Sequence, residues 1–256
     1  MTTDQAGHAA VPAAVSAGGA PAGSLSIAFC PCPPLLHPAV EGRPAEETTA
    51  LRRACAEAVE ALLADGPEAV VVVAPGVDGR CGAGDAGDLR GVGVDVEVAF
   101  SGGVRPGGRR TRPALTLGAW LLDQAGYAGL RLGVGPAGLA AALADLDGGT
   151  VGVLALGDGS ARRSVKAPGY LDGAAAPFDA AVAAALAAGD AAALAALDAE
   201  EGERLLAAGV PVWRAVGQVV EGRTVTARLH HDAAPLGVGY LVASWTAAPT
   251  ASPTAP

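Results

Sequence analysis

One ten-residue segment combines a carboxylate, a hydroxyl and several cations directly after an apolar run. Gly157–Lys166 reads Gly-Asp-Gly-Ser-Ala-Arg-Arg-Ser-Val-Lys, and its three cations are Arg162, Arg163 and Lys166. These cations would attract a carboxylate or a phosphate, and the glycines would let backbone N–H groups approach it closely. Asp158 and Ser160 are candidate catalytic groups, because Asp158 could orient or deprotonate a hydroxyl. The alternative is a solvated loop whose arginines pair with surface acids, and both interpretations stay open.

Cysteine and histidine are the other residues that could do chemistry, and there are only four of each. Cys30, Cys32 and His37 lie close together in the sequence. Zinc and iron–sulfur sites need four ligands, usually with cysteines two or more residues apart, and no second pair is evident. We therefore expect mainly core thiols, since free cysteine is one of the most buried residue types. Cys32 is retained as a third catalytic candidate.

Two histidines, His230 and His231, are adjacent near the end of the chain. Neighbouring side chains on a regular strand point to opposite faces. His231 continues an apolar row and His230 a polar row, so the two cannot bind one ion together. We expect His231 to be half-buried and hydrogen-bonded. A metal site made of Cys32, Asp78 and His231 is the alternative.

The composition excludes two classes of partner. The chain has 256 residues and a formal net charge of −9, which argues against binding a nucleic-acid backbone. No uncharged apolar run is long enough to cross a membrane. Residues 1–24 have neither the positive start nor the apolar stretch of a signal peptide, so we expect a cytoplasmic protein with reduced cysteines. Residues 1–24 and 247–256 are predicted to be disordered tails around a single domain, 25–246.

Hydrophobic patterning predicts alternating strands and helices. The predicted strands are Leu25–Phe29, Ala69–Ala74, Val92–Val98, Leu130–Val134, Val151–Leu156, Thr224–His231 and Gly239–Trp245. The predicted helices are Ala45–Ala64, Ala114–Gln124, Gly138–Ala144 and an interrupted helical region, Phe178–Val220. This order predicts an α/β fold, with a mostly parallel central sheet, helices on both faces and an added C-terminal strand pair. Because Val92–Val98 alternates apolar and polar residues, we expect it at or near an edge.

Ligands of such sheets lie beyond the carboxyl ends of the strands. Three predicted loops leave those ends, namely Cys30–Pro38, Pro75–Gly91 and Gly157–Lys166. Any active site should lie among them.

Several short strings follow one another along this frame. They are Cys32-Pro-Pro-Leu-Leu36, Gly157-Asp-Gly-Ser160, Lys166-Ala-Pro-Gly-Tyr170, Pro177-Phe-Asp179, Gly189-Asp190 and Leu197-Asp198. From the first strand to Trp245, these strings and the order of elements resemble the LigB-type superfamily, which comprises the catalytic subunits of class III extradiol ring-cleavage dioxygenases. The resemblance implies a ferrous iron held by two His and one Glu, with a further His as acid/base.

The positions that the resemblance assigns to these groups hold other residues. The first His ligand falls on Cys32 and the second on Pro75–Asp78. The acid/base His falls on Ala161, and the Glu ligand falls near Val212 or Trp213. A 2-His-1-carboxylate triad leaves open positions for catechol and O2, and none of its members is present. We therefore expect that the usual ring-opening reaction is lost.

Three functions stay open. The first is a degenerate dioxygenase-like protein that binds a small anionic or phenolic ligand in the ancestral cleft without catalysis. The second is an enzyme of different chemistry that uses Cys32, Asp158 and Ser160. The third is an active ring-opening oxidoreductase whose metal is held by Cys32, Asp78 and His231. No cofactor is expected, apart from Fe(II) if the family activity survives. The expected partner is a small molecule, and a homodimer stays open.

Overall fold

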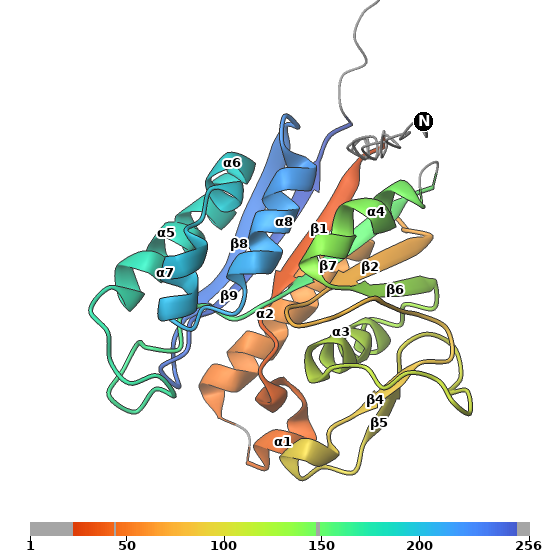
Figure 1. Cartoon of the computed structure of the whole chain (residues 1–256), viewed down its shortest axis with the longest axis horizontal. Coiled ribbons are helices and arrows are strands. Elements are labelled where there is room, and N and C mark those ends of the chain that lie inside the picture. The colour runs from red at the N-terminus through yellow and green to blue at the C-terminus, as the bar shows by residue number, and fades with distance from the viewer. Residues whose placement is uncertain (1–22, 44, 147–148, 250–256) are drawn as a thin grey trace, which may run out of the picture.

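A computed structural model describes residues 23–43, 45–146 and 149–249. It contains one large sheet with helices on both faces (Figure 1). The strands of this sheet are β1 (Leu25–Cys30), β2 (Ala69–Val73), β3 (Arg80–Cys81), β6 (Leu130–Val134), β7 (Val151–Leu156), β8 (Val225–Ala233) and β9 (Tyr240–Ala247). Most of the two predicted tails lies outside the described residues. Ala247, predicted to begin the second tail, is the last residue of β9.

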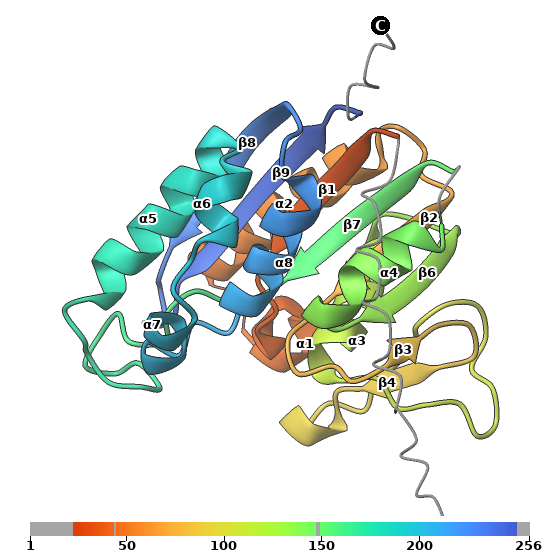
Figure 2. The same ribbon diagram turned by 45° about the horizontal axis from the view of Figure 1, so that its top comes forward.

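The seven strands lie in the order β3-β6-β2-β7-β1-β9-β8. β1 pairs with β7, β7 with β2, and β2 with β6, all in parallel. β9 is antiparallel to both β1 and β8, which places the last two strands together at one edge. The neighbouring strands can be followed in Figure 2. The predicted fold class, a mostly parallel sheet with an added C-terminal strand pair, is confirmed.

Helices cover the two faces of the sheet. One face carries α2 (Glu46–Leu63) and α3 (Pro113–Gln124). The opposite face carries α4 (Leu139–Ala144), α5 (Ala175–Ala188), α6 (Ala191–Ala195) and α8 (Val210–Val220). The short helices are α1 (Pro38–Glu41), α7 (Ala199–Arg204) and the 3-10 turns η1 (Pro34–Leu36), η2 (Arg90–Val92) and η3 (Pro136–Gly138). None of the helices in the described part of the chain combines the length and apolar character that a membrane span requires.

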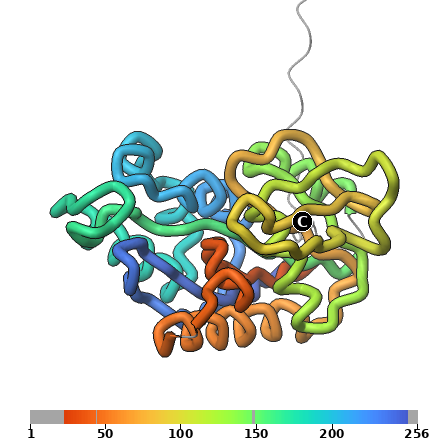
Figure 3. The backbone as a smooth tube through the Cα atoms, turned by 90° about the horizontal axis from the view of Figure 1, so that it is seen from below, coloured from red at the N-terminus to blue at the C-terminus, as the bar shows by residue number. Residues whose placement is uncertain are grey.

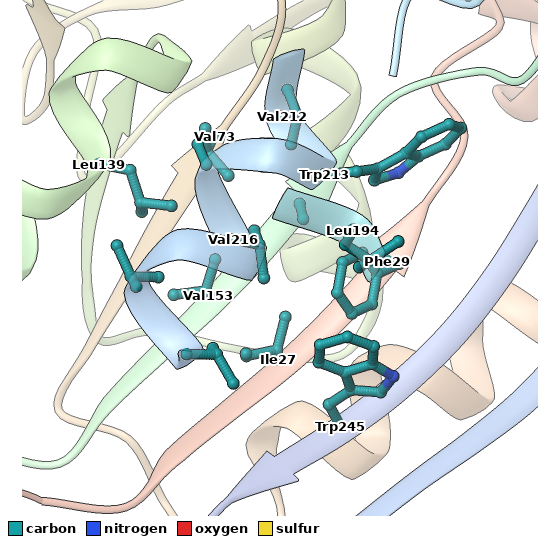
Figure 4. Packing of buried hydrophobic residues seen from close by; sticks show 14 of the residues in the cluster. Ile27, Phe29, Val73, Leu139, Val153, Leu194, Val212, Trp213, Val216 and Trp245 are labelled. Carbon is teal, nitrogen blue, oxygen red and sulfur yellow. The ribbon is translucent and has the colours of Figure 1, made fainter. Parts of the chain in front are cut away.

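The central strands form where the sequence is continuously apolar. Every residue of β1, β2 and β7 is buried, as expected for strands covered on both faces. On the side of α8, Ile27, Phe29 and Val153 pack beneath the helix (Figure 4). The Trp245 ring lies edge-on to Phe29, with ring centroids 4.9 Å apart. Its Nε1–H donates to the carbonyl oxygen of Leu186 at 2.7 Å, which joins β9 to the last turn of α5.

The prediction for Val92–Val98 was wrong. Only its end is extended, as β5 (Glu97–Ala99), which pairs antiparallel with β4 (Ala86–Asp88) in a separate two-stranded sheet. The Arg110 guanidinium bridges Asp88 and Glu97 across this pair. The alternating pattern therefore belongs to a separate two-stranded sheet, and not to the edge of the main sheet.

The direction of the chain connections reverses between β2 and β7. The chain leaves β2 toward α3 on one face and leaves β7 toward α5 on the other. Such a reversal between adjacent parallel strands is where α/β sheets bind ligands. Figure 3 views the molecule from the side at which the parallel strands end. The teal and blue segment that contains α5–α8 lies on one side, and the yellow–green segment around β4 and β5 lies on the other.

Candidate functional site

The ends of β1 and β7 bring two predicted site residues together. The Cys32 backbone N–H donates to Asp158 Oδ1 at 2.8 Å. Burial raises the pKa of Asp158 to about 6, although the hydrogen bond from Cys32 acts in the opposite direction. Asp158 can therefore hold or release a proton near neutral pH. Burial, and then the nearby Asp158 carboxylate, raise the pKa of the Cys32 thiol, so Cys32 is a poor thiolate nucleophile.

Tyr240, which is buried at the start of β9, completes this polar group. Burial raises the pKa of the Tyr240 hydroxyl, and the charges of Asp158 and Cys32 raise it further, which shows that the three side chains are neighbours. Tyr240 was not among the site residues predicted from the sequence. Its only signal was an aromatic residue at the start of the last strand, and the pairing of β9 with β1 brings it beside Cys32.

Ser160 has a structural role. It is completely buried, and its hydroxyl donates to the carbonyl oxygen of Leu205 at 3.0 Å. Its backbone N–H donates to Asp179 Oδ1 at 2.8 Å. A substrate has no path to this hydroxyl in the structure, so the geometry does not support the catalytic prediction for Ser160.

Asp179 is the residue that organises the loop, although no site role was predicted for it. It has no exposed surface, and Arg163 Nη1 donates to its Oδ2 at 2.8 Å. Two glycines make room for it. A Cβ at Gly239 would lie 2.4 Å from Asp179 Oδ2, and one at Gly159 would lie 2.9 Å from Oδ1. Gly159 therefore admits a carboxylate of the protein itself, whereas the sequence predicted close approach of a ligand.

The predicted anion-binding cations do not form a common pocket. Arg163 neutralises Asp179, and Arg162 Nη1 donates to the carbonyl oxygen of Gly169 at 2.7 Å. Lys166 is exposed to solvent. The two arginines hold the loop in place, which corresponds to neither alternative considered from the sequence: their partners are a buried acid and a carbonyl, and not a ligand or surface acids.

The structure does not assemble the predicted metal ligands. Cys32 lies between β1 and η1, Asp78 is exposed after β2, and His231 is in β8. Within residues 23–43, 45–146 and 149–249, no three Cys, His, Asp or Glu side chains form a group that could hold a metal ion. His37 instead caps α1, where its Nδ1 accepts from the Ala39 N–H at 3.3 Å.

The prediction for the adjacent histidines assumed a regular strand, but β8 has a bulge between Leu229 and His231. His231 is half-buried, as predicted. Its Nε2, however, is buried with no hydrogen-bond partner among the described residues. His230 is the residue with partners, and its side chain is only 2% exposed.

A groove of about 800 Å³ opens at the carboxyl edge, between the turns after β2 and β6 and the helices α7 and α8. Most of its surface is apolar. The groups that shape it include Pro75, Pro136, Leu206, Ala207, Val210 and Ala215. Its volume lies within the range of small-molecule sites, about 300–1,000 Å³. Pro75 belongs to one of the three loops expected to form a site.

Three polar side chains, those of Glu203, Arg214 and Gln218, also line the groove. Glu203 and Gln218 are exposed, and Arg214 is half-buried. Arg214 Nη1 donates to the carbonyl oxygen of Leu197, which fixes the direction of the guanidinium group. The groove therefore combines apolar walls with one oriented cation and one carboxylate.

Leu206 is the most unusual residue of the groove. Its φ is +57°, in the left-handed region that costs a residue with a Cβ about 1 kcal/mol or more. The residue is 46% exposed. Backbone strain and exposed apolar surface both concentrate at binding sites.

The loop after β7 supports this groove from behind. Leu205, next to Leu206, accepts hydrogen bonds through its carbonyl oxygen from Ser160 Oγ and from the Ala161 N–H. The Gly209 N–H donates to the carbonyl oxygen of Asp158 at 2.8 Å. A Cβ at Gly157 would lie 2.3 Å from the Gly209 Cα, so glycine is required for this contact. The loop after β7 thus positions the residues that line the groove.

No protein-family model matches the chain, and no curated protein matches it. The resemblance to extradiol dioxygenases stays a prediction.

Proposed function

We propose that this chain binds a small aromatic acid or phenol in the groove beside α7 and α8. The observation that carries the proposal is the groove itself, about 800 Å³ in volume and mainly apolar, at the sheet edge where α/β folds bind ligands. Apolar walls favour an aromatic ring because its burial removes apolar surface from water.

The polar groups of the groove suit the two ends of such a ligand. A ligand carboxylate would pair with Arg214, since charge-assisted bonds from a guanidinium group are among the stronger hydrogen bonds in proteins. A phenolic hydroxyl would donate to the Glu203 carboxylate, which only accepts. A hydroxylated aromatic acid can use both contacts, and a simple phenol only the second.

We propose further that the chain is a LigB-type relative that has lost ring opening and kept ligand binding. Support comes from the fold class and from the position of Cys32 and Asp158 at adjacent strand ends, where the resemblance sets the ancestral centre. Ala161, at the position of the acid/base His, cannot transfer a proton. The proposed ligand class is the one that the sequence suggested. The residues proposed to contact the ligand are now Arg214 and Glu203, and not those of the loop after β7.

An enzyme of different chemistry is the second candidate. The observation that favours it is the Asp158 carboxyl group, whose pKa is raised to about 6 beside Cys32 and Tyr240. Such a group suits general acid or base catalysis at neutral pH. Turnover of a phenolic compound that Asp158→Asn abolishes would favour this candidate over simple binding.

The test is calorimetry with benzoate, 4-hydroxybenzoate, phenol and catechol. We expect 4-hydroxybenzoate to bind more tightly than either phenol or benzoate. Arg214→Gln should weaken the binding of both acids roughly 10- to 100-fold, because a hydrogen bond to a charged group contributes about 1.5–3 kcal/mol. The affinity for phenol should stay unchanged. Ala137→Trp, at an exposed position on the groove wall, should block all four compounds.

The matched control is Arg112→Gln, which removes an exposed arginine that does not line the groove. Binding that is absent with every compound, or that survives Ala137→Trp unchanged, contradicts the proposal.

A further inference from the structure

A second polar cluster lies between the sheet and α2, far from the groove in the fold. It joins Glu57 of α2, His230 of β8 and Ser244 of β9. His230 Nε2 lies 2.9 Å from Ser244 Oγ, and His230 Nδ1 lies 3.4 Å from Glu57 Oε2. The imidazole is almost completely buried, whereas Ser244 keeps partial exposure. A hydroxyl, an imidazole and a carboxylate in this order form a nucleophile, a base and a group that orients the base.

The chemistry of the three groups fixes the direction of the hydrogen bonds. A carboxylate only accepts, so His230 Nδ1 must carry the proton that faces Glu57. In the neutral ring, Nε2 then presents its lone pair to the Ser244 hydroxyl. The hydrogen bond from His230 is the largest cause that lowers the pKa of Glu57, which keeps this group ionised. Arg53 binds the other carboxylate oxygen at 3.2 Å.

The pairing of β8 with β9 explains how His230 reaches Ser244. Leu229 packs against the core cluster on the α5 face, and the register shifts between Leu229 and His231, leaving His230 without a paired Cα. Ser244 pairs directly with Arg228, two residues before His230, so His230 lies on the same α2 face and diagonal to Ser244. Bulges are frequent beside active sites, and this one follows His230 directly.

We propose that Ser244 is a nucleophile activated by His230 and accepts an acyl group from small activated esters. Ser244 Oγ attacks the ester carbonyl carbon while its proton moves to His230 Nε2. The bond between the carbonyl carbon and the leaving oxygen then breaks, and the leaving alcohol takes the proton back from Nε2. The products are acyl-Ser244 and the free alcohol, with no change in oxidation state. Glu57 orients the imidazole throughout.

The half-buried position of Ser244 limits the donor to short acyl groups. The reaction uses general-base activation, which contributes roughly 10²- to 10⁴-fold. The site is separate from the groove and goes beyond the proposed function, because it forms a covalent bond.

The experiment treats the full chain with 4-nitrophenyl acetate. It follows 4-nitrophenolate release and the mass of the intact protein, and locates the acetyl group by peptide mapping. We expect one acetyl group on Ser244 in the unmodified sequence and none in Ser244→Ala. His230→Gln should slow acetylation of Ser244 about 10²- to 10⁴-fold, and Glu57→Gln should slow it less. Ser164→Ala is the control, since the Ser164 hydroxyl accepts from the Lys166 N–H and should not affect the rate.

Two results would overturn the proposal. One is the absence of an acetyl group on Ser244 in the unmodified protein. The other is an equal rate of Ser244 acetylation with and without the imidazole. Circular dichroism would show whether His230→Gln is folded. If it is unfolded, Glu57→Gln replaces it in the comparison, because Glu57 lies on the surface of a helix. An unchanged rate of Ser244 acetylation in Glu57→Gln then counts against the proposal.

Discussion

Replacing Asp158 by Asn should stabilise the protein at neutral pH and leave it unchanged in acid. Burial raises the pKa of Asp158 from 3.8 to about 6, so the folded protein holds this proton more tightly than the unfolded chain. Stability therefore falls as the pH rises from about 4 to about 6, and the whole penalty is present above that range. The pKa difference corresponds to at most about 3 kcal/mol. An Asn side chain removes the charge, and its carbonyl oxygen can still accept from the Cys32 N–H.

The assay is urea denaturation of Asp158→Asn and of the unmodified protein at pH 4, 5, 6, 7 and 8. The difference in the free energy of unfolding should be close to zero at pH 4 and should reach 1–3 kcal/mol in favour of the variant at pH 8, roughly the linkage limit above. Asp78→Asn, which removes an exposed carboxylate, is the control. A difference that does not change with pH, or a variant that is less stable than the unmodified protein at pH 8, would refute the reasoning.

Two further substitutions test the loop and the core. Arg163→Met should destabilise the protein by about 3 kcal/mol, because removing one partner leaves the buried Asp179 carboxylate unpaired. The double variant Arg163→Met, Asp179→Leu should recover part of this loss in urea denaturation, and a double variant no better than the single one would contradict the buried-pair argument. Trp245→Phe should cost roughly 1–3 kcal/mol, because the Leu186 carbonyl group loses its buried donor; an unchanged unfolding midpoint would show that this hydrogen bond contributes nothing.

The fold could be predicted from the sequence wherever burial is uniform. Ala69–Val73 and Val151–Leu156 are apolar throughout, and both are central strands. Val92–Val98 was assigned to the wrong sheet because its alternation is compatible with any sheet that has one solvent-exposed face. Its actual partner, Ala86–Asp88, contains Gly and Asp and gives no strand signal. The small sheet depends on ion pairs from Arg110, which a local pattern does not reveal.

The candidate site could be predicted only as a region. Parallel topology pointed to the carboxyl ends of β1, β2 and β7, and in the structure Cys32 and Asp158 meet there. The alternation rule placed His230 on the same face as Arg228, as observed, and failed only after the bulge, where His231 pairs with Val242 of the α2-face cluster. The groove gave no local signal, since its walls are mainly Ala, Pro, Val and Leu.

The density of polar residues after β7 has a structural cause. This segment leaves a buried strand and passes beneath β9 and α7, where every backbone N–H and C=O needs a partner. Asp179 satisfies the Ser160 N–H, and Arg163 then neutralises the buried charge of Asp179. Ser160 in turn fixes the carbonyl group of Leu205, at the start of the groove wall. A chain of such requirements produces the same Asp, Ser and Arg residues as a catalytic loop would, and only partners distant in sequence distinguish the two. The plain apolar wall that the loop supports is therefore the better candidate for contact with a ligand.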